Sequence, residues 1–316
     1  MKRVVAAVML LLLAVMFVSG CGGSKPAQEK PKETEIVLIL KNLVNPVWLD
    51  MKKGAEAAAQ KYGVKLTVLA PLKADNNEEQ IRAIEDSIAK KVAAIVLVPS
   101  DSKGIIPGIE KANAAGIPVI NVNTKALGGK TETFIAVENF DAAKKVAEAM
   151  AQKLNKKGKV IILEGVPGAQ SAMDLHAGTL EGLKPYPDIK VVASQTAKFQ
   201  RAEAMKVMED LLQRYPDIDA VLAANDEMAL GAIEAIDAAK KTGKILVSGL
   251  DANKDAVKAI ADGKMTLSCD KRSYQQGYVG VETAVKLLKG EKIEPRIVIE
   301  TVLVDKSNVA EYLNKQ

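Results

Sequence analysis

Asn225 and Asp226 lie where an apolar, strand-like run ends and a helical pattern begins, in the segment VLAANDEMALG (221–231). Asp226 can accept hydrogen bonds from the first N–H groups of that helix, and Glu227 suits the positive end of its dipole. One cap is sufficient for a helix. The sequence therefore predicts that Asp226 caps the helix, and the rest of the chain must show whether Asn225 has another role.

Polar residues follow the apolar runs at several equivalent places. Asn45, Asn123 and Asp251 occur in LKNLVNP, NVNTK and SGLDANKD, each directly after a predicted strand. Because ligands bind at the carboxyl ends of strands in open α/β sheets, we expect these residues to meet Asn225 in one site.

Motifs that suggest catalysis are incomplete. Ser100 and Lys103 form an S-x-x-K motif and Lys241 begins a K-T-G motif, as in serine acyl-transferases, but the S-D-N element between them is missing. The single histidine, His176, has no partners at metal-binding spacing. The sequence predicts no enzyme, no cofactor and no metal site. An acyl-serine enzyme using Ser100 and Lys103 stays as an alternative.

The composition is that of a globular chain with room for two domains. Of the 316 residues, 48% are hydrophobic and 26% are charged. Aromatic residues make up only 3%. Alanine, valine, isoleucine and leucine must then build the core, as in parallel sheets covered by helices.

The N-terminus reads as a secretory signal. A basic MKR and a short apolar stretch lead to VSGC (18–21), which resembles the bacterial lipobox. We expect residues 1–20 to be removed, Cys21 to be lipidated, and residues 21–34 to be a flexible tether. The protein is then extracytoplasmic and anchored to the cell membrane by lipid. Removing Lys2 and Arg3 lowers a net charge of only +5, so nucleic acid is not an expected partner.

Short apolar runs alternate with amphipathic helical patterns along the rest of the chain. This alternation predicts the α/β class with parallel sheets and right-handed crossovers, and the number of strands favours two Rossmann-like lobes. The expected strands are 36–40, 65–69, 93–98, 117–122, 159–165, 189–195, 219–225, 244–250, 264–268 and 296–304.

From about Ile36 onward, the chain resembles the periplasmic sugar-binding proteins of the ribose-binding type. The segments that carry the resemblance are NPVW (45–48), AAIVLVPSDS (93–102), AGIPVINVN (115–123), AANDEMALGAIEAI (223–236), GLDAN (249–253) and GVETAVKLLKGEK (280–292). The resemblance implies a type I periplasmic binding protein fold, in which two lobes joined by three crossovers close on a solute by a hinge.

By this resemblance, residues 35–137 plus 271–300 form the N-terminal lobe and residues 138–270 plus 301–316 form the C-terminal lobe. The function it implies is a substrate-binding lipoprotein for sugar transport: a monomer that delivers a small sugar, polyol or cyclitol to an ABC permease. A sensor that presents its ligand to a chemoreceptor or receptor kinase is the alternative.

The resemblance also implies the ligand-binding residues. Trp48 keeps one of two family aromatics while Val47 replaces the other, and Phe199 matches an aromatic of the second lobe. Flat rings cover the apolar faces of a sugar, and amides and carboxylates hold its hydroxyls. The expected set is Asn45, Trp48, Asn123, Thr124, Met173, Phe199, Asn225, Asp251 and Lys271.

The departures from the family bear on the solute. The family's Asp-Arg pair is Asn123-Thr124 here, an arginine aligns with Met173, and a glutamine aligns with Lys271. A site built for particular hydroxyls rejects ligands that lack them. We therefore expect a solute other than ribose, and an acidic solute if Lys271 points into the cleft.

Overall fold

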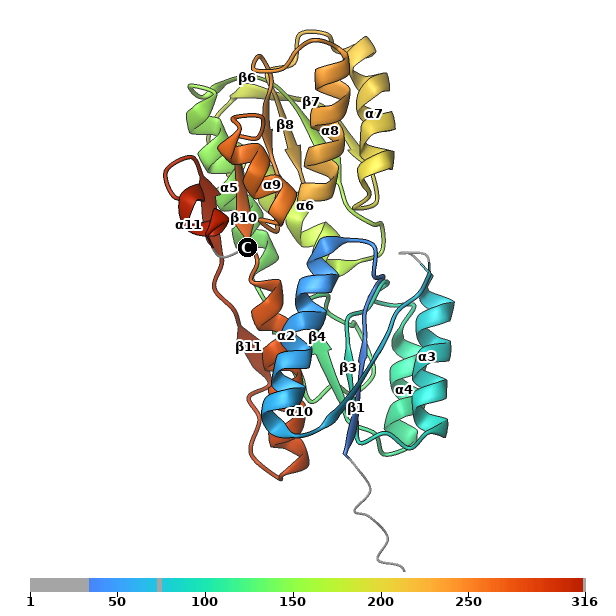
Figure 1. Cartoon of the computed structure of the whole chain (residues 1–316). Coiled ribbons are helices and arrows are strands. Elements are labelled where there is room, and N and C mark those ends of the chain that lie inside the picture. The colour runs from blue at the N-terminus through green and yellow to red at the C-terminus, as the bar shows by residue number, and fades with distance from the viewer. Residues whose placement is uncertain (1–33, 73–75, 315–316) are drawn as a thin grey trace, which may run out of the picture. The chain divides into compact units, whose positions relative to one another are not determined.

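The structure is a computed structural model that describes residues 34–72 and 76–314. It contains two six-stranded sheets with their helices (Figure 1). The predicted signal, Cys21 and nearly all of the tether lie outside the described residues. Within the described ranges, no helix is long and apolar enough to cross a membrane.

The first sheet is entirely parallel. From edge to edge its strands are β11 (Arg296–Val298), β5 (Thr133–Ala136), β4 (Val119–Val122), β3 (Ala94–Leu97), β1 (Glu35–Ile39) and β2 (Lys65–Leu69). Its helices are α2 (Pro46–Tyr62), α3 (Asn77–Ala89), α4 (Ile106–Ala114) and α10 (Ser273–Leu288). We call this sheet with its helices the first lobe.

The second sheet is parallel except for one edge strand, which runs antiparallel to its neighbour. Its strands are β12 (Val302–Asp305), β10 (Leu267–Asp270), β9 (Leu246–Ser248), β8 (Ala220–Ala223), β6 (Lys157–Glu164) and β7 (Asp188–Thr196). Its helices are α5 (Asn139–Lys153), α6 (Gln170–Leu183), α7 (Arg201–Arg214), α8 (Asp226–Ala238), α9 (Lys254–Ala261) and α11 (Val309–Leu313). This is the second lobe, and the predicted α/β class is confirmed.

Two strand predictions are wrong in detail. The run 296–304 is not one strand but two, β11 and β12, which belong to different sheets. The chain crosses between the sheets at residues 299–301, and an apolar run alone does not reveal such a crossing. The four-residue strand β5 was not expected, since it follows a polar stretch and is too short to show a period.

The first sheet explains why its strands read as continuous apolar runs. Ile36 and Leu38 pack into the cluster that contains α2 residues, whereas Val37 and Ile39 pack with residues of α3 and α4 on the opposite face. Successive side chains of a strand point to opposite faces, so a sheet buried on both faces requires an apolar residue at every position.

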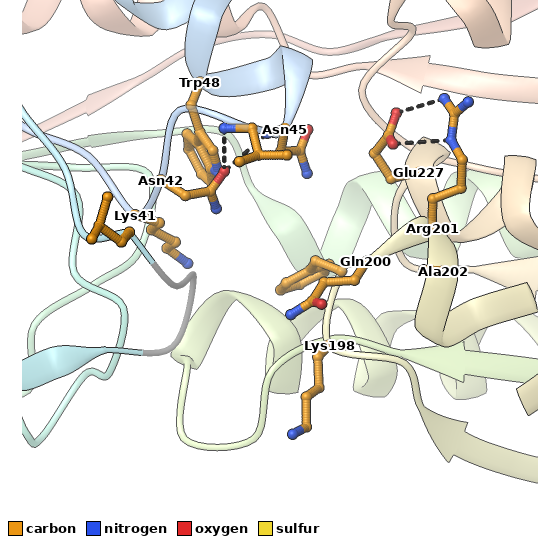
Figure 2. Close-up of a pocket in the computed structure, with 12 residues that line it drawn as sticks. Lys41, Asn42, Asn45, Trp48, Lys198, Gln200, Arg201, Ala202 and Glu227 are labelled. Carbon is orange, nitrogen blue, oxygen red and sulfur yellow. Dashed lines mark hydrogen bonds and ion pairs between the residues drawn. The ribbon is translucent and has the colours of Figure 1, made fainter. Parts of the chain in front are cut away.

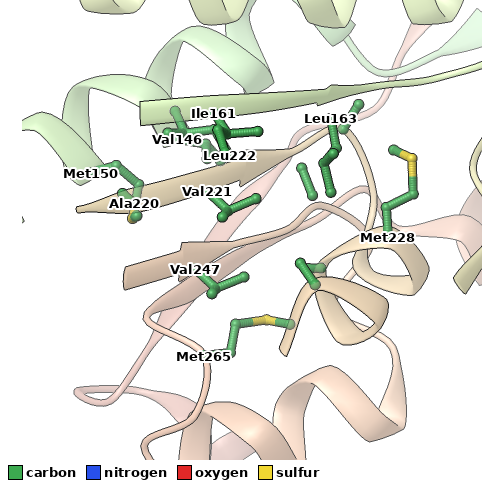
Figure 3. Packing of buried hydrophobic residues seen from close by; sticks show 14 of the residues in the cluster. Val146, Met150, Ile161, Leu163, Ala220, Val221, Leu222, Met228, Val247 and Met265 are labelled. Carbon is green, nitrogen blue, oxygen red and sulfur yellow. The ribbon is translucent and has the colours of Figure 1, made fainter. Parts of the chain in front are cut away.

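The second sheet has one large core, drawn in part in Figure 3. Val221 and Leu222 of β8 lie in it with Met228, from the first turn of α8, and all three are almost fully buried. The strand end and the helix start are thus held by the same core. This packing fixes the loop that carries Asn225.

Helices α2 and α10 of the first lobe pack closely together. A Cβ on Gly54 would come within 1.9 Å of the Tyr274 carbonyl oxygen, and one on Gly277 within 1.9 Å of the Met51 carbonyl oxygen. Glycine at both positions allows the two backbones to touch. This contact sets the position of α2, whose first turn contains the predicted site residue Trp48.

Candidate functional site

The loop after β1 is held by short-range hydrogen bonds. Asn42 Oδ1 accepts from the backbone N–H groups of Val44 (3.0 Å) and Asn45 (2.9 Å). Asn45 Oδ1 in turn accepts from Val47 N at 3.2 Å and caps α2, with Pro46 at the first helical position. The loop therefore presents its side chains in a defined arrangement (Figure 2).

Lys41 is the residue of this loop that sequence reasoning missed. It is only 5% exposed, and its Nζ lies 5.6 Å from the centre of the Trp48 ring and 6.0 Å from that of Phe199. These distances are in the range of cation–π interactions. Its position in LKNLVNP, directly after the predicted strand 36–40, was the available signal.

Phe199 reaches the site from the loop before α7. Lys198 and Phe199 both adopt left-handed backbone angles, with φ of 51° and 59°, which are uncommon for residues other than glycine. The end of β6 makes room for the ring, because a Cβ on Gly165 would lie 2.1 Å from Phe199 Cζ. The second aromatic is thus placed by a strained loop and a missing side chain.

The predicted roles of Asn225 and Asp226 require a correction. Asn225 is the N-cap of α8, since its Oδ1 accepts from Met228 N at 3.0 Å. Asp226 is fully buried and accepts from Asn253 N (2.8 Å) and Ser268 Oγ (2.6 Å). Asp226 therefore ties the loop after β9 to α8, whereas Asn225 both caps the helix and faces the cavity described below.

Asp251 and Lys271 form a buried ion pair. Lys271 Nζ lies 2.9 Å from Asp251 Oδ1, and the two side chains are 9% and 4% exposed. Burial raises the pKa of Asp251, and the Lys271 ammonium opposes that shift. Much of the charge of Lys271 is therefore matched by a carboxylate within the protein.

Asp226 titrates in the same cluster. Its burial, together with the nearby Asp251 charge, raises its pKa to about 8, although the bonds from Ser268 and Asn253 and the charge of Lys271 act in the opposite direction. Asp226 therefore keeps its proton to a higher pH than an ordinary carboxyl group does.

Asn123 and Thr124 differ in what they contact. Asn123 has a φ of 65° and donates through Nδ2 to Gln276 Oε1 at 3.1 Å, so its amide is oriented by α10. The hydroxyl of Thr124 lies 3.3 Å from Asn123 Oδ1 and 2.9 Å from Ser171 Oγ of the second lobe. Thr124 thus bridges the lobes.

Loops from both lobes enclose a cavity of ≈ 30 Å³, which we call the inner cavity. Seven of the nine predicted residues line it. The full lining is Lys41, Asn45, Val47, Trp48, Asn123, Ser171, Leu175, Phe199, Asn225, Asp251 and Lys271.

Two predicted residues do not line the inner cavity. Thr124 is buried beside it. Met173 is 46% exposed, whereas Ser171 and Leu175, on either side of it, do line the cavity. Residues four apart share one face of a helix and the residue between them does not. The geometry of α6 therefore places Leu175 at this wall, and not Met173, which aligns with the family arginine.

The inner cavity opens toward a wider space of ≈ 400 Å³, the cleft mouth, with which it shares Lys41, Asn45, Trp48 and Phe199 (Figure 2). At its rim, Arg201 donates to both carboxylate oxygens of Glu227, at 3.0 and 3.1 Å. Flat rings, amides and charged side chains therefore meet at the carboxyl ends of the strands, where the sequence predicted the ligand-binding residues.

The elements for other chemistry do not converge on this site. Ser100 and Lys103 do not line the inner cavity, and Lys241 follows α8, in the other lobe. In the part of the chain that the structure describes, no group of three or more side chains could hold a metal ion. What the site offers to a small polar molecule is two aromatic rings, amides and a buried ion pair.

The comparisons with known proteins agree with this geometry. Residues 36–292 match the family model described as a periplasmic binding protein domain. The chain belongs to the periplasmic binding protein family. The expected resemblance to ribose-type proteins is confirmed, because this binding protein is 37% identical over 305 residues to the ribose import binding protein of Bacillus subtilis (strain 168), covering 94% of this chain and 97% of that one.

Solved structures support the same placement. A solute-binding protein from Actinobacillus succinogenes with bound D-allose superposes with a TM-score of 0.84 at 36% identity, covering 89% of this chain and 100% of that one. A Bacillus halodurans protein with bound myo-inositol has a TM-score of 0.84 at 29% identity, covering 91% and 100%. The relatives are transport binding proteins, and this chain is a binding protein, not an enzyme.

Proposed function

We propose that this chain is the extracytoplasmic solute-binding protein of an ABC importer and that it closes its two lobes around a small neutral sugar, polyol or cyclitol. The observation that carries the proposal is the lining of the inner cavity, which combines Trp48 of the first lobe with Phe199 of the second and a set of amides. The relatives named above bind ribose, D-allose and myo-inositol.

The chemistry of the lining suits a polyhydroxylated ring. Trp48 and Phe199 offer flat apolar surfaces for C–H groups. Asn123 and Asn225 each use part of their hydrogen-bonding capacity within the protein, which fixes the orientation of the amide. An oriented amide discriminates between hydroxyl arrangements, since a mismatched ligand leaves it unpaired after closure.

The ion pair favours a neutral solute over an acidic one. Lys271 does point into the inner cavity, but its Nζ is 2.9 Å from Asp251. A ligand carboxylate would have to compete with Asp251 for the ammonium, and breaking a buried pair is unfavourable. A hydroxyl can instead donate to Asp251 and leave the pair intact.

The finer parts of the proposal extend the family assignment. Cys21 is lipidated, residues 21–34 tether the protein to the membrane, and the ABC permease is its partner. The lobes comprise 35–137 plus 271–300 and 138–270 plus 301–316. Support for these limits is that each falls between strands of different sheets. Replacing Cys21 with serine should prevent incorporation of a labelled fatty acid.

A thermal-shift screen tests the binding function. The purified protein is heated with D-ribose, D-allose or myo-inositol, and with D-ribonate and D-glucuronate as acidic probes. A ligand that binds only the folded protein adds about 3 kcal/mol at a hundred times its dissociation constant. We expect a raised midpoint with one or more neutral probes. A shift confined to the acids would refute the neutral class, and no shift with any probe would refute the proposed solute class.

A variant pair confirms that the shift comes from this site. Asp251→Asn removes the carboxylate that we expect to accept a solute hydroxyl, so the shift should disappear. Asp210→Asn makes the same chemical change on an exposed position of α7 and should leave the shift unchanged.

A further inference from the structure

The two lobes contact one another directly beside the inner cavity. The hydroxyls of Thr124 and Ser171 lie 2.9 Å apart, and both residues are buried. Ser102 adds two bonds: its N–H donates to the Gly168 carbonyl oxygen at 3.2 Å, and its Oγ accepts from Gln170 N at 2.9 Å. We call these five residues, Ser102, Thr124, Gly168, Gln170 and Ser171, the lobe seam.

The hydrogen bond from Gln170 N to Ser102 Oγ caps the start of α6. This helix begins at Gln170, and its N-cap residue, Ala169, has no side chain that can accept a hydrogen bond. The first N–H groups of a helix have no partner within the helix. Ser102 belongs to the loop after β3, so the hydroxyl that caps α6 comes from the opposite lobe.

The backbone at Gly168 allows the loop of the first lobe to come close. Gly168 has a φ of 87°, and a Cβ there would lie 2.3 Å from Asp101 Oδ2 of the first lobe. Asp101 is itself fixed, because its Oδ1 accepts from Lys103 N at 2.8 Å. Glycine at 168 thus lets the two loops come within hydrogen-bonding distance.

Hydrogen bonds within the first lobe also hold its two seam residues in place. Leu127 N donates to the Ser102 carbonyl oxygen at 2.8 Å, which links the loops after β3 and β4. Asn121 Nδ2 donates to the Thr124 carbonyl oxygen at 2.8 Å. Ser102 and Thr124 are therefore presented to the second lobe as one unit.

We propose that the Ser102 hydroxyl caps the start of α6 from across the cleft and that the lobe seam is a solute-independent latch which sets the population of the closed conformation. When the lobes part, α6 loses its cap and the two buried hydroxyls lose each other. The seam residues are positioning residues: they act on affinity through closure. The inference rests on the lobe movement in the proposed function, but its test needs no solute.

The test measures the distance between the lobes in the purified protein. Spin labels are placed on Asp86→Cys in α3 and Lys206→Cys in α7, two exposed positions, with Cys21 replaced by serine. Pulsed electron resonance gives the ratio of short to long distances. Ser102→Ala should lower the closed-to-open ratio about fivefold, as for a typical N-cap. Thr124→Val leaves the Ser171 hydroxyl without this partner when the lobes close and should lower the ratio about fivefold or more.

Two controls separate the latch from a general effect of losing a hydroxyl. Ser102→Thr keeps the acceptor and should restore the ratio. Ser87→Ala removes a buried hydroxyl that bonds only to Ala83 O within α3, and should not change it.

An unchanged ratio in both seam variants overturns the inference, as does an equal change in Ser87→Ala. Circular dichroism checks the folding of each variant, and if Ser102→Ala does not fold, Thr124→Val decides. A solute screen that finds nothing leaves this outcome unaffected.

Discussion

At the scale of single residues, the site depends on which atoms are already engaged. Asn225 uses its Oδ1 for the helix cap and its Nδ2 for Phe199 O at 3.3 Å. It therefore links the second-lobe aromatic to the start of α8. The rings of Trp48 and Phe199, by contrast, line the inner cavity with apolar surface.

Removing a ring should weaken binding without affecting the fold. Phe199→Ala removes a partly buried ring that lines the inner cavity, so we expect the dissociation constant of the best probe to rise about tenfold, from a stacking contribution of about 1 kcal/mol and lost burial. Calorimetric titration measures it. Phe140→Ala, on an exposed ring of α5, is the control and should bind as the parent does. Equal affinities for all three proteins would contradict the placement of Phe199.

Asp226 should make stability depend on pH. Its pKa is raised to about 8 by burial, so its contribution is fully present below the ordinary carboxyl pKa and is lost as the pH rises through about 8. Relative to Asp226→Asn, the parent should lose up to about 1 kcal/mol of unfolding free energy per pH unit between pH 5 and 8. Urea unfolding at several pH values measures the difference. Parallel curves for the two proteins would show that Asp226 is ionised throughout.

At the scale of elements, close helix packing positions the first-lobe wall. Gly277→Ala places a Cβ 1.9 Å from the Met51 carbonyl oxygen, so α10 and α2 must separate. We expect a loss of about 1–3 kcal/mol in unfolding free energy, as for overpacked cores. Gln275→Ala, on an exposed position of the same helix, should change it by less than about 0.5 kcal/mol. Chemical denaturation measures both variants. An unfolding free energy of Gly277→Ala equal to that of the unmodified protein would show that α2 and α10 can move apart without loss of stability.

The sequence predicted the strands better than it predicted the contacts of individual side chains. The apolar runs located nearly all strands because a sheet buried on both faces leaves a continuous signal. It failed at β11 and β12, where a single apolar run serves two sheets. It selected Met173, although Leu175 of the same helix lines the inner cavity. An alignment does not show which face of the helix packs toward the cavity. Sequence reasoning also gave the cap to Asp226, since a sequence cannot show which of two adjacent polar side chains accepts the hydrogen bond from the helix N–H group.

At the scale of the whole molecule, affinity combines contact and closure. A solute that binds only the closed form has an apparent dissociation constant that is larger than the intrinsic one by the inverse of the closed fraction. Ser102→Ala should therefore weaken all solutes by one common factor, whereas Asp251→Asn should affect them unequally. Titrations of two probes against both variants measure this. Unequal factors for Ser102→Ala would mean that it acts on the solute directly.

The most direct test of the central claim uses Trp48, the one tryptophan in the chain, which lines the inner cavity. Its emission, recorded while D-ribose, D-allose or myo-inositol is added, reports on that wall alone. We predict a saturable change with at least one of these neutral solutes, which is lost in Asp251→Asn and kept in Asp210→Asn. A flat titration with every neutral solute, together with no shift of the unfolding midpoint, would contradict the account.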